Sequence, residues 1–317
     1  MSATKQPLKL RDFQKEDVLL MRKSNYNVLC ANAPGTGKTI EALACIAIDR
    51  VKLCPAIIVA PASVTDNWKT EANKWLPWAR VHVIKNRKTP LPRQLCHVYI
   101  ISWSLLVDRS IDLLSVRPKF IVVDEAHFAK NEDAERSQVL YGMSRRIPHR
   151  LLLTGTPIVN NERELTALQG LFPGGNPPLI RRFLEDAAPD IPAKTRCLVP
   201  IKLPKKFEKE YNRAQEEFAM WLEMKLRERL EGGDVEAACA RALAAEALVK
   251  VGYLRRLVGR AKTNAAVDWA ARAVRIGEPV VIFAEHQAVI ERLSNSMKQQ
   301  RIRHVILDGS TPKRKRQ

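Results

Sequence analysis

Residues 32–39 read Asn-Ala-Pro-Gly-Thr-Gly-Lys-Thr. The apolar run Val28–Ala31, typical of a strand, precedes it, and an amphipathic helical pattern follows as far as about Ile48. Gly35 and Gly37 allow successive backbone N–H groups to turn toward one centre, and the start of the helix adds the positive end of its dipole. A strand, a glycine-rich turn and a helix in this order predict a loop that cradles the phosphates of a nucleotide.

The side chains of this loop predict its chemistry. The ammonium group of Lys38 is expected to reach the outer phosphates of a nucleoside triphosphate, and the hydroxyl of Thr39 is expected to ligate Mg²⁺. The predicted phosphate site therefore consists of Pro34, Gly35, Thr36, Gly37, Lys38 and Thr39.

An acidic pair follows a second apolar run. Phe120–Val123 is typical of a buried parallel strand, and Asp124-Glu125-Ala126-His127 comes directly after it. A strand that ends in two carboxylates can place Asp124 on Mg²⁺ and Glu125 beside the water that attacks the γ-phosphate. Together with Lys38, these two residues are the predicted catalytic groups of a site that hydrolyses nucleoside triphosphates.

Residues 1–172 alternate short β-branched runs with helical patterns, which predicts βαβ units and a parallel sheet. Both motifs, and the later Thr154-Gly155-Thr156-Pro157, follow a predicted strand, and parallel sheets carry their functional groups at this end of the strands. The predicted strands are Val28–Ala31, Ala56–Ala60, Val81–Ile84, Val98–Ile101, Phe120–Val123 and Arg150–Leu153.

The rest of the chain divides into three predicted parts. A connector rich in Pro and Gly, 173–203, ends in a strand-like segment at Cys197–Leu203. Residues 204–262 show helical spacing that Gly232-Gly233 interrupts, which predicts a helical hairpin. Residues 263–317 predict the beginning of a second, incomplete α/β lobe, whose elements are a helix from Lys262, strands Val280–Phe283 and His304–Leu307, and a helix between these strands.

The charge balance favours a polyanionic partner. Lys and Arg number 53 against 34 Asp and Glu, which gives a net charge of +19 in a chain of 317 residues. An excess of this size is more typical of a nucleic-acid partner than of an acidic small molecule, although it also keeps a surface solvated.

The cysteines and the apolar runs favour an intracellular location. The six cysteines lie far apart and form no C-x-x-C pair, which argues against structural zinc and against a disulfide framework, and fits a reducing compartment. No run of 18 apolar residues and no signal-like N-terminal stretch occurs, so membrane spanning and secretion are not expected. The expected compartment is the cytoplasm or nucleoid of a prokaryote or virus, or the nucleus of a eukaryote.

Several segments resemble the Swi/Snf branch of superfamily-two helicases, over nearly the whole chain. The segment that follows the helical hairpin is most similar to the HepA-related (annealing helicase) subgroup, because the hairpin is short and Val281–His286 comes after it. The segments that carry the resemblance are Leu10–Gln14, Pro61–Trp68, Ile101–Leu106, Asp124–His127, Leu151–Pro157, Phe283–His286 and Asp308–Thr311.

This resemblance implies a RecA-like first lobe and a motor that uses ATP with Mg²⁺ to move along or remodel double-stranded or branched DNA. It implies that Gln14 reads adenine and that His127 and Thr156 couple the nucleotide to DNA. The residues that it places on DNA phosphates are Pro61, Ser63, Ser102, Thr154 and Gly155.

The resemblance leaves two alternatives open. Residues 1–317 contain no counterpart of the family's motifs V and VI, whose arginines reach the γ-phosphate, so slow hydrolysis by this length of chain is expected. A module that binds ATP and DNA without hydrolysis is therefore one alternative. An RNA helicase of the Asp-Glu-Ala-His type is the other, and the oligomeric state stays open.

Overall fold

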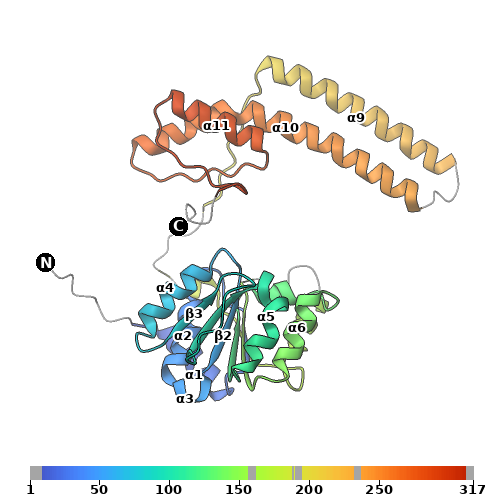
Figure 1. Ribbon diagram of the computed structural model, residues 1–317. Helices are drawn as coiled ribbons and strands as arrows, with labels where there is room; N and C mark the ends of the chain where they lie inside the picture. The colour runs from blue at the N-terminus through green and yellow to red at the C-terminus, as the bar shows by residue number, and fades with distance from the viewer. Residues whose placement is uncertain (1–8, 156–161, 188, 190–194, 232–236, 312–317) are drawn as a thin grey trace. The chain divides into compact units, whose positions relative to one another are not determined.

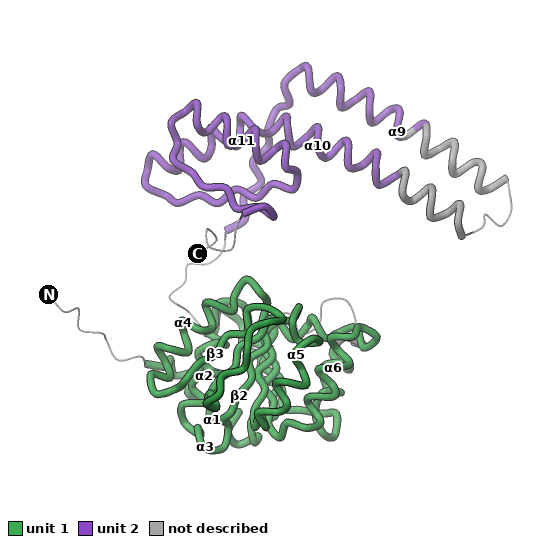
Figure 2. The backbone as a smooth tube through the Cα atoms, viewed as in Figure 1, with its two compact units in different colours: residues 1–194 green, residues 195–317 purple. Residues whose placement is uncertain are grey.

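The computed structural model describes residues 9–155, 162–187, 189, 195–231 and 237–311 (Figure 1). The chain forms two compact units, residues 1–194 and residues 195–317 (Figure 2). The two units are considered separately.

The first unit is built on a sheet of seven strands, all parallel, in the order β3-β4-β2-β5-β6-β1-β7. The central strands are fully buried on both faces, which explains their continuous apolar sequences. The strands are β1 Val28–Cys30, β2 Ala56–Ala60, β3 Val81–Ile84, β4 Val98–Ser102, β5 Phe120–Val123, β6 His149–Leu153 and β7 Leu179–Ile180.

Helices cover both faces of this sheet and form one apolar core on each side (Figure 1). The helices of one face are α1 Asp12–Lys23, α2 Lys38–Ile48, α3 Arg50–Leu53 and α4 Thr65–Trp75. The other face carries α5 Trp103–Ser115, the short 3₁₀ helix η1 Ala126–Ala129, α6 Glu135–Ser144 and α7 Glu162–Gln169. The short helix α8, Leu184–Ala187, follows the edge strand β7.

The structure confirms the expected α/β fold with a parallel sheet, and each of the six predicted strands is present to within one residue at either end. The seventh strand, β7, was not predicted. It has only two residues, Leu179 and Ile180, which pair with Leu29 and Cys30 of β1. A strand this short, inside a segment rich in Pro and Gly, has no hydrophobic periodicity by which a sequence could reveal it.

The second unit is mainly helical and differs from the sequence prediction in three places. Its helices are α9 Lys205–Glu231, α10 Ala237–Arg275 and α11 Gln287–Gln299. No separate helix begins at Lys262, because α10 runs through this position without a break. The segments Val280–Phe283 and His304–Leu307 are extended but pair with no strand of the described residues, and Cys197–Leu203 likewise forms no strand there.

A small apolar core holds α10 against α11 in this unit; it consists of Val267, Ala270, Val289, Leu293 and Met297. Val280 and Ile282 of the first of the two extended segments pack against it and are partly buried. Phe283 is 93% exposed and Val305 is 95% exposed, because no element among the described residues covers their side chains. Their β-branched and aromatic composition predicted strands that, in this structure, lack a partner.

Candidate nucleotide-binding site

The glycine-rich loop connects β1 to α2 and depends on two left-handed backbone positions. Gly35 has φ +86° and Gly37 has φ +93°, a region that side chains with a Cβ atom rarely adopt. A Cβ atom on Gly37 would also lie 2.5 Å from Nε2 of Gln14. The loop therefore requires glycine at position 37 for both its backbone conformation and its packing.

Lys38 begins α2 and folds back over the loop. Its ammonium donates hydrogen bonds to the carbonyl oxygens of Asn32, at 2.6 Å, and Ala33, at 3.1 Å. The hydroxyl of Thr36 donates to the same Ala33 carbonyl at 2.9 Å. A phosphate group placed at the N-terminus of α2 would meet the ammonium of Lys38, the backbone N–H groups of the loop and the helix dipole together.

Gln14 ties the first helix to this loop. It is only 5% exposed, its Nε2 donates to the carbonyl of Thr36 at 2.9 Å, and its Oε1 accepts from the backbone N–H of Arg11 at 3.0 Å. The side chain thus caps α1 and fixes the loop at the same time. One amide hydrogen and one oxygen lone pair of Gln14 remain for hydrogen bonds to a nucleotide base.

Asp124 ends β5, and several donors hold it in place. Its Oδ1 accepts from the N–H of Glu125 at 3.0 Å, and its Oδ2 accepts from the indole N–H of Trp68 at 2.8 Å. The indole of Trp103 donates to the backbone carbonyl of Asp124 at 2.9 Å. Burial raises the pKa of Asp124, while the Trp68 hydrogen bond and the charge of Lys38 act in the opposite direction.

Glu125 adopts a left-handed backbone conformation, with φ 49° and ψ 52°, at the turn into η1. This turn leaves the carboxylate 43% exposed, with its Oε2 3.2 Å from Nδ1 of His127. A non-glycine residue in this conformation is uncommon and is found more often at functional sites. The turn separates the half-buried carboxylate of Asp124, which two donors hold, from the carboxylate of Glu125.

The segment after β6 lies against the phosphate loop. Thr154 donates its backbone N–H to the carbonyl of Cys30, and a Cβ atom on Gly155 would lie 2.9 Å from Cγ of Pro34. Thr154 has no exposed surface, so the contact with DNA predicted for it is not supported by this arrangement. Gly155 packs on the loop, and Thr156 lies outside the described residues.

The other residues predicted to contact DNA follow neighbouring strands. Pro61 follows β2 and Ser102 ends β4, and these strands pair through Ala60 and Ser102. Ser63 is exposed in the turn that leads into α4. Ser102 is only 5% exposed and its hydroxyl lies 3.0 Å from that of Ser104, so the backbone N–H groups at the start of α5 are better placed than the Ser102 hydroxyl for a phosphate contact.

A buried polar network beneath the loop was not predicted from the sequence. Nδ2 of Asn32 donates to Asp17 at 2.9 Å and to Glu41 at 3.4 Å. The guanidinium of Arg182 lies 2.7 Å from the carboxylate of Asp17, and the backbone carbonyl of Arg182 accepts a hydrogen bond from the N–H of Ala33 at 2.9 Å. The network thus connects α1, the loop, α2 and the segment after β7, four parts whose proximity no local sequence pattern reveals.

The ionisation of Glu41 allows this network to be tested by measuring the free energy of unfolding at different pH values. Burial, and secondly the charge of Asp17, raises the pKa of Glu41 from 4.5 to about 7. The folded protein therefore binds a proton more tightly than the unfolded chain, so the free energy of unfolding should fall as pH rises from about 4.5 to about 7 and stay low above it. Glu41→Gln should remove this fall and stabilise the nucleotide-free protein above pH 7 by on the order of 2–3 kcal/mol.

Denaturant unfolding of the parent and Glu41→Gln at several pH values measures this difference. Glu135→Gln, at an exposed position of α6, is the matched control and should follow the parent. Parallel pH profiles for the parent and Glu41→Gln would show that Glu41 is ionised at its ordinary pKa in the folded protein.

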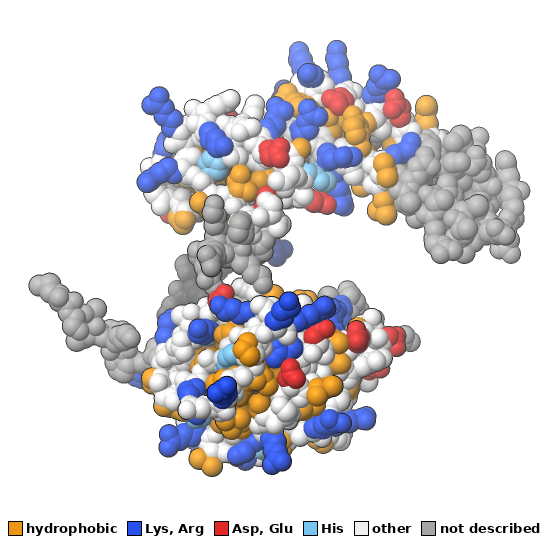
Figure 3. Space-filling view, viewed as in Figure 1, with side chains coloured by type: hydrophobic (Ala, Val, Ile, Leu, Met, Phe, Trp, Pro, Cys, Tyr) orange, Lys and Arg blue, Asp and Glu red, His pale blue; other side chains and the backbone are white. Residues whose placement is uncertain are grey.

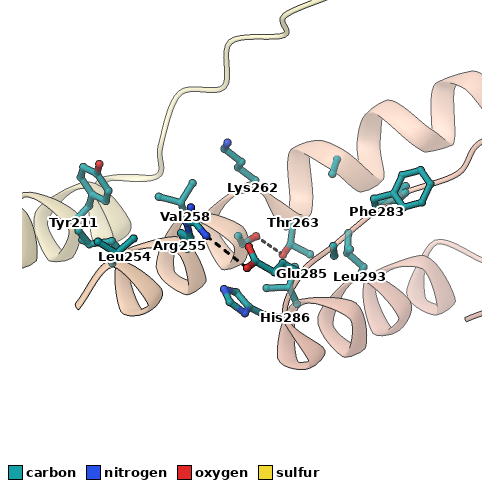
Figure 4. A pocket seen from close by; sticks show the side chains of 16 residues that line it. Tyr211, Leu254, Arg255, Val258, Lys262, Thr263, Phe283, Glu285, His286 and Leu293 are labelled. Atoms are coloured by element: carbon teal, nitrogen blue, oxygen red, sulfur yellow. Dashed lines mark hydrogen bonds and ion pairs between the residues drawn. The ribbon is translucent and has the colours of Figure 1, made fainter. Parts of the chain in front are cut away.

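A cavity of about 620 Å³ lies in the second unit, between α10 and residues 282–286 (Figure 4). Arg255 and Glu285 approach each other to 3.7 Å across it, and Thr263 donates to the carbonyl of Gly259. Its lining is mostly apolar and includes none of the predicted site residues. We therefore assign the cavity no part in nucleotide binding.

A comparison with protein families identifies the first unit. The model described as the SNF2-related domain matches residues 13–174, about half of the chain. The SWI2/SNF2 ATPase core of Sulfolobus solfataricus, solved in complex with double-stranded DNA, is similar in structure with a TM-score of 0.55 and 20% identity, over 95% of this chain and 72% of that one. This likeness confirms the expected RecA-like fold.

Curated relatives agree with the family. The human protein named DNA annealing helicase and endonuclease ZRANB3 is 24% identical over 95% of this chain, and the chain spans 31% of that protein. The ISWI chromatin-remodeling complex ATPase ISW2 of Saccharomyces cerevisiae is 32% identical, over 50% of this chain and 15% of its own length. The first of these aligns through both units, as the expected likeness to the annealing helicase subgroup requires. The chain belongs to the SNF2-related domain family.

Proposed function

We propose that this chain is the ATP-hydrolysing motor of a DNA translocase that acts on double-stranded or branched DNA. One observation supports this proposal above all others. Lys38, Asp124-Glu125 and Gly155 follow β1, β5 and β6, which are neighbours in a single parallel sheet, so the groups required for triphosphate hydrolysis share one edge.

The loop and Lys38 would hold the β- and γ-phosphates of ATP. Asp124 and Thr39 offer oxygen ligands that suit Mg²⁺. Among the described residues, each carboxylate oxygen of Asp124 accepts one hydrogen bond and retains a lone pair, and the hydroxyl of Thr39 lies in the first turn of α2. When bound, Mg²⁺ neutralises charge on the phosphate oxygens. Glu125 would orient the attacking water and accept its proton, and Lys38 would stabilise charge on the transferred phosphoryl group.

Gln14 would recognise adenine with the amide hydrogen and lone pair that the loop leaves to it. Gly155, which packs on Pro34, and His127, which approaches Glu125, would report the state of the nucleotide to the rest of the motor. Thr156 would act with them.

DNA would bind at the carboxyl edge of the paired strands β2 and β4, since Pro61 and Ser63 follow β2 and the N-terminus of α5 follows β4. Contacts of this kind grip phosphates without reading bases. The net charge of +19 supports such a partner, and Lys and Arg side chains are spread over the visible faces of both units (Figure 3). The ZRANB3 relative is named a DNA annealing helicase and endonuclease, which supports DNA as the partner.

DNA affinity should therefore depend steeply on salt and little on base sequence. Binding releases counterions from the duplex, so the affinity should fall by at least about tenfold as monovalent salt rises from about 50 mM to about 200 mM. Fluorescence anisotropy with two unrelated duplexes over a salt series measures both effects. A flat salt response, or a strong preference for one of the two sequences, would contradict the proposed mode of binding.

Phosphate release tests the proposed activity itself. The release of phosphate from ATP by this length of chain should be slow, and duplex DNA should accelerate it whereas duplex RNA of the same sequence should not. Stimulation by RNA alone would favour an RNA helicase, and tight ATP binding without any release would favour a binding module.

A further inference from the structure

Two tryptophans converge on one aspartate from opposite faces of the sheet. Trp68 of α4 belongs to the apolar core on one face, and Trp103 of α5 belongs to the core on the other. Trp68 donates to the Oδ2 carboxylate oxygen of Asp124 at 2.8 Å, and Trp103 donates to its backbone carbonyl at 2.9 Å. Burial of these indoles does not explain why both N–H groups point at the same residue.

Each tryptophan follows closely on a segment proposed to hold DNA. Trp68 lies in the first turn of α4, directly after the turn that exposes Ser63, and it is only 1% exposed itself. Trp103 is the first residue of α5, next to Ser102. A shift of either segment toward a phosphate must therefore displace an indole that is bonded to Asp124.

We propose that Trp68 is a positioning residue, which orients the carboxylate of Asp124 for Mg²⁺ and links this orientation to DNA contact at the start of α4. The inference rests on the proposed function. With Glu125 N–H on Oδ1 and Trp68 N–H on Oδ2, both oxygens of Asp124 have fixed directions. Movement of α4 changes only the Trp68 bond, because the Glu125 bond lies within the β5–η1 turn.

The same helix offers a matched control. Trp75, at the C-terminal end of α4, packs against the same core, but its buried indole N–H has no hydrogen-bond partner among the described residues. Trp68→Phe and Trp75→Phe thus make the same chemical change in one helix. Only the first removes a hydrogen bond to the proposed metal ligand.

The experiment measures ATP binding by calorimetry, with Mg²⁺ and with EDTA, and then repeats the Mg²⁺ titration in the presence of duplex DNA. Trp68→Phe should weaken Mg²⁺-ATP binding by about tenfold, as expected for loss of a hydrogen bond to a charged group, and leave the affinity in EDTA unchanged. It should also reduce the effect of DNA on ATP affinity. Trp75→Phe should match the parent in every titration.

Replacement of Trp68 by β-(3-benzothienyl)alanine provides a second variant, because sulfur takes the place of the N–H while the bicyclic shape stays. It should reproduce the Trp68→Phe result even if the smaller ring impairs folding, which melting curves would show. Equal Mg²⁺-ATP affinity in this variant and the parent would overturn the positioning role alone. A parent protein that binds ATP equally with and without Mg²⁺, and does not respond to DNA, would overturn the proposed function as well.

Discussion

Glu125→Gln should bind ATP almost as tightly as the parent and release phosphate about 10²–10⁴-fold more slowly, the range typical of a lost general base. Glutamine keeps the size of the side chain and one oxygen, so water can still be held, but it cannot accept a proton. Glutamate and glutamine adopt the left-handed backbone conformation at position 125 at a similar cost in free energy, since both carry a Cβ atom. Hydrolysis should therefore be lost without a change in the fold.

Single-turnover measurements, with the protein in excess over labelled ATP, resolve even slow phosphate release. Asp133→Asn, which removes an exposed carboxylate a few residues further along the chain, is the control and should hydrolyse ATP at the parent rate. If Glu125→Gln also did so, the water would have to be activated by a different group.

The fold of the first unit could be predicted well from the sequence because short local patterns determine its strands and its glycine-rich loop. A parallel strand buried on both faces has a continuous apolar sequence, as in Phe120–Val123, and the residue after it stands at the functional edge. The glycine-rich loop likewise needs left-handed residues at fixed positions, and Gly37 meets this requirement. The same reasoning missed β7, whose two residues pair with a strand about 150 positions away in the chain.

The second unit shows where such reasoning goes wrong. Val280–Phe283 and His304–Leu307 have the composition of strands, but a strand exists only when another strand supplies hydrogen bonds. The break predicted at Lys262 was also wrong, since the helical periodicity of α10 continues through it. Composition shows that a segment is able to form a strand, and pairing with a neighbouring strand determines whether the strand forms.

In the candidate site, too, short motifs identify some residues, and only the structure reveals the others. Lys38 and Asp124 are identified by short motifs, since their positions along the chain fix their places on the sheet. The indole of Trp68 reaches Asp124 across 56 residues of sequence, and Arg182 reaches Asp17 across 165. No short motif indicates that the side chains of Trp68 and Trp103 reach this site. The structure shows that both are buried and that both donate to Asp124.

Lys38→Ala should weaken ATP binding by about 100-fold, because it removes charge-assisted hydrogen bonds to the outer phosphates. In the nucleotide-free protein the ammonium binds the carbonyls of Asn32, which is buried, and Ala33, which is half-buried. Water can enter the space that the lysine side chain leaves and donate to these carbonyls, so the variant should melt near the parent temperature. The loss should thus appear in nucleotide affinity rather than in folding.

Calorimetric titration with ATP and Mg²⁺ separates these two effects when melting curves are recorded for the same samples. Lys23→Ala removes an exposed lysine at the end of α1 and should leave the affinity unchanged, which controls for the loss of one positive charge. AMP should bind the parent and Lys38→Ala with similar affinity, because it lacks the phosphates that Lys38 would reach. Equal ATP affinity in Lys38→Ala and the parent would mean that the ammonium stays on its own loop, and that residues 32–39 do not hold a triphosphate in the proposed way.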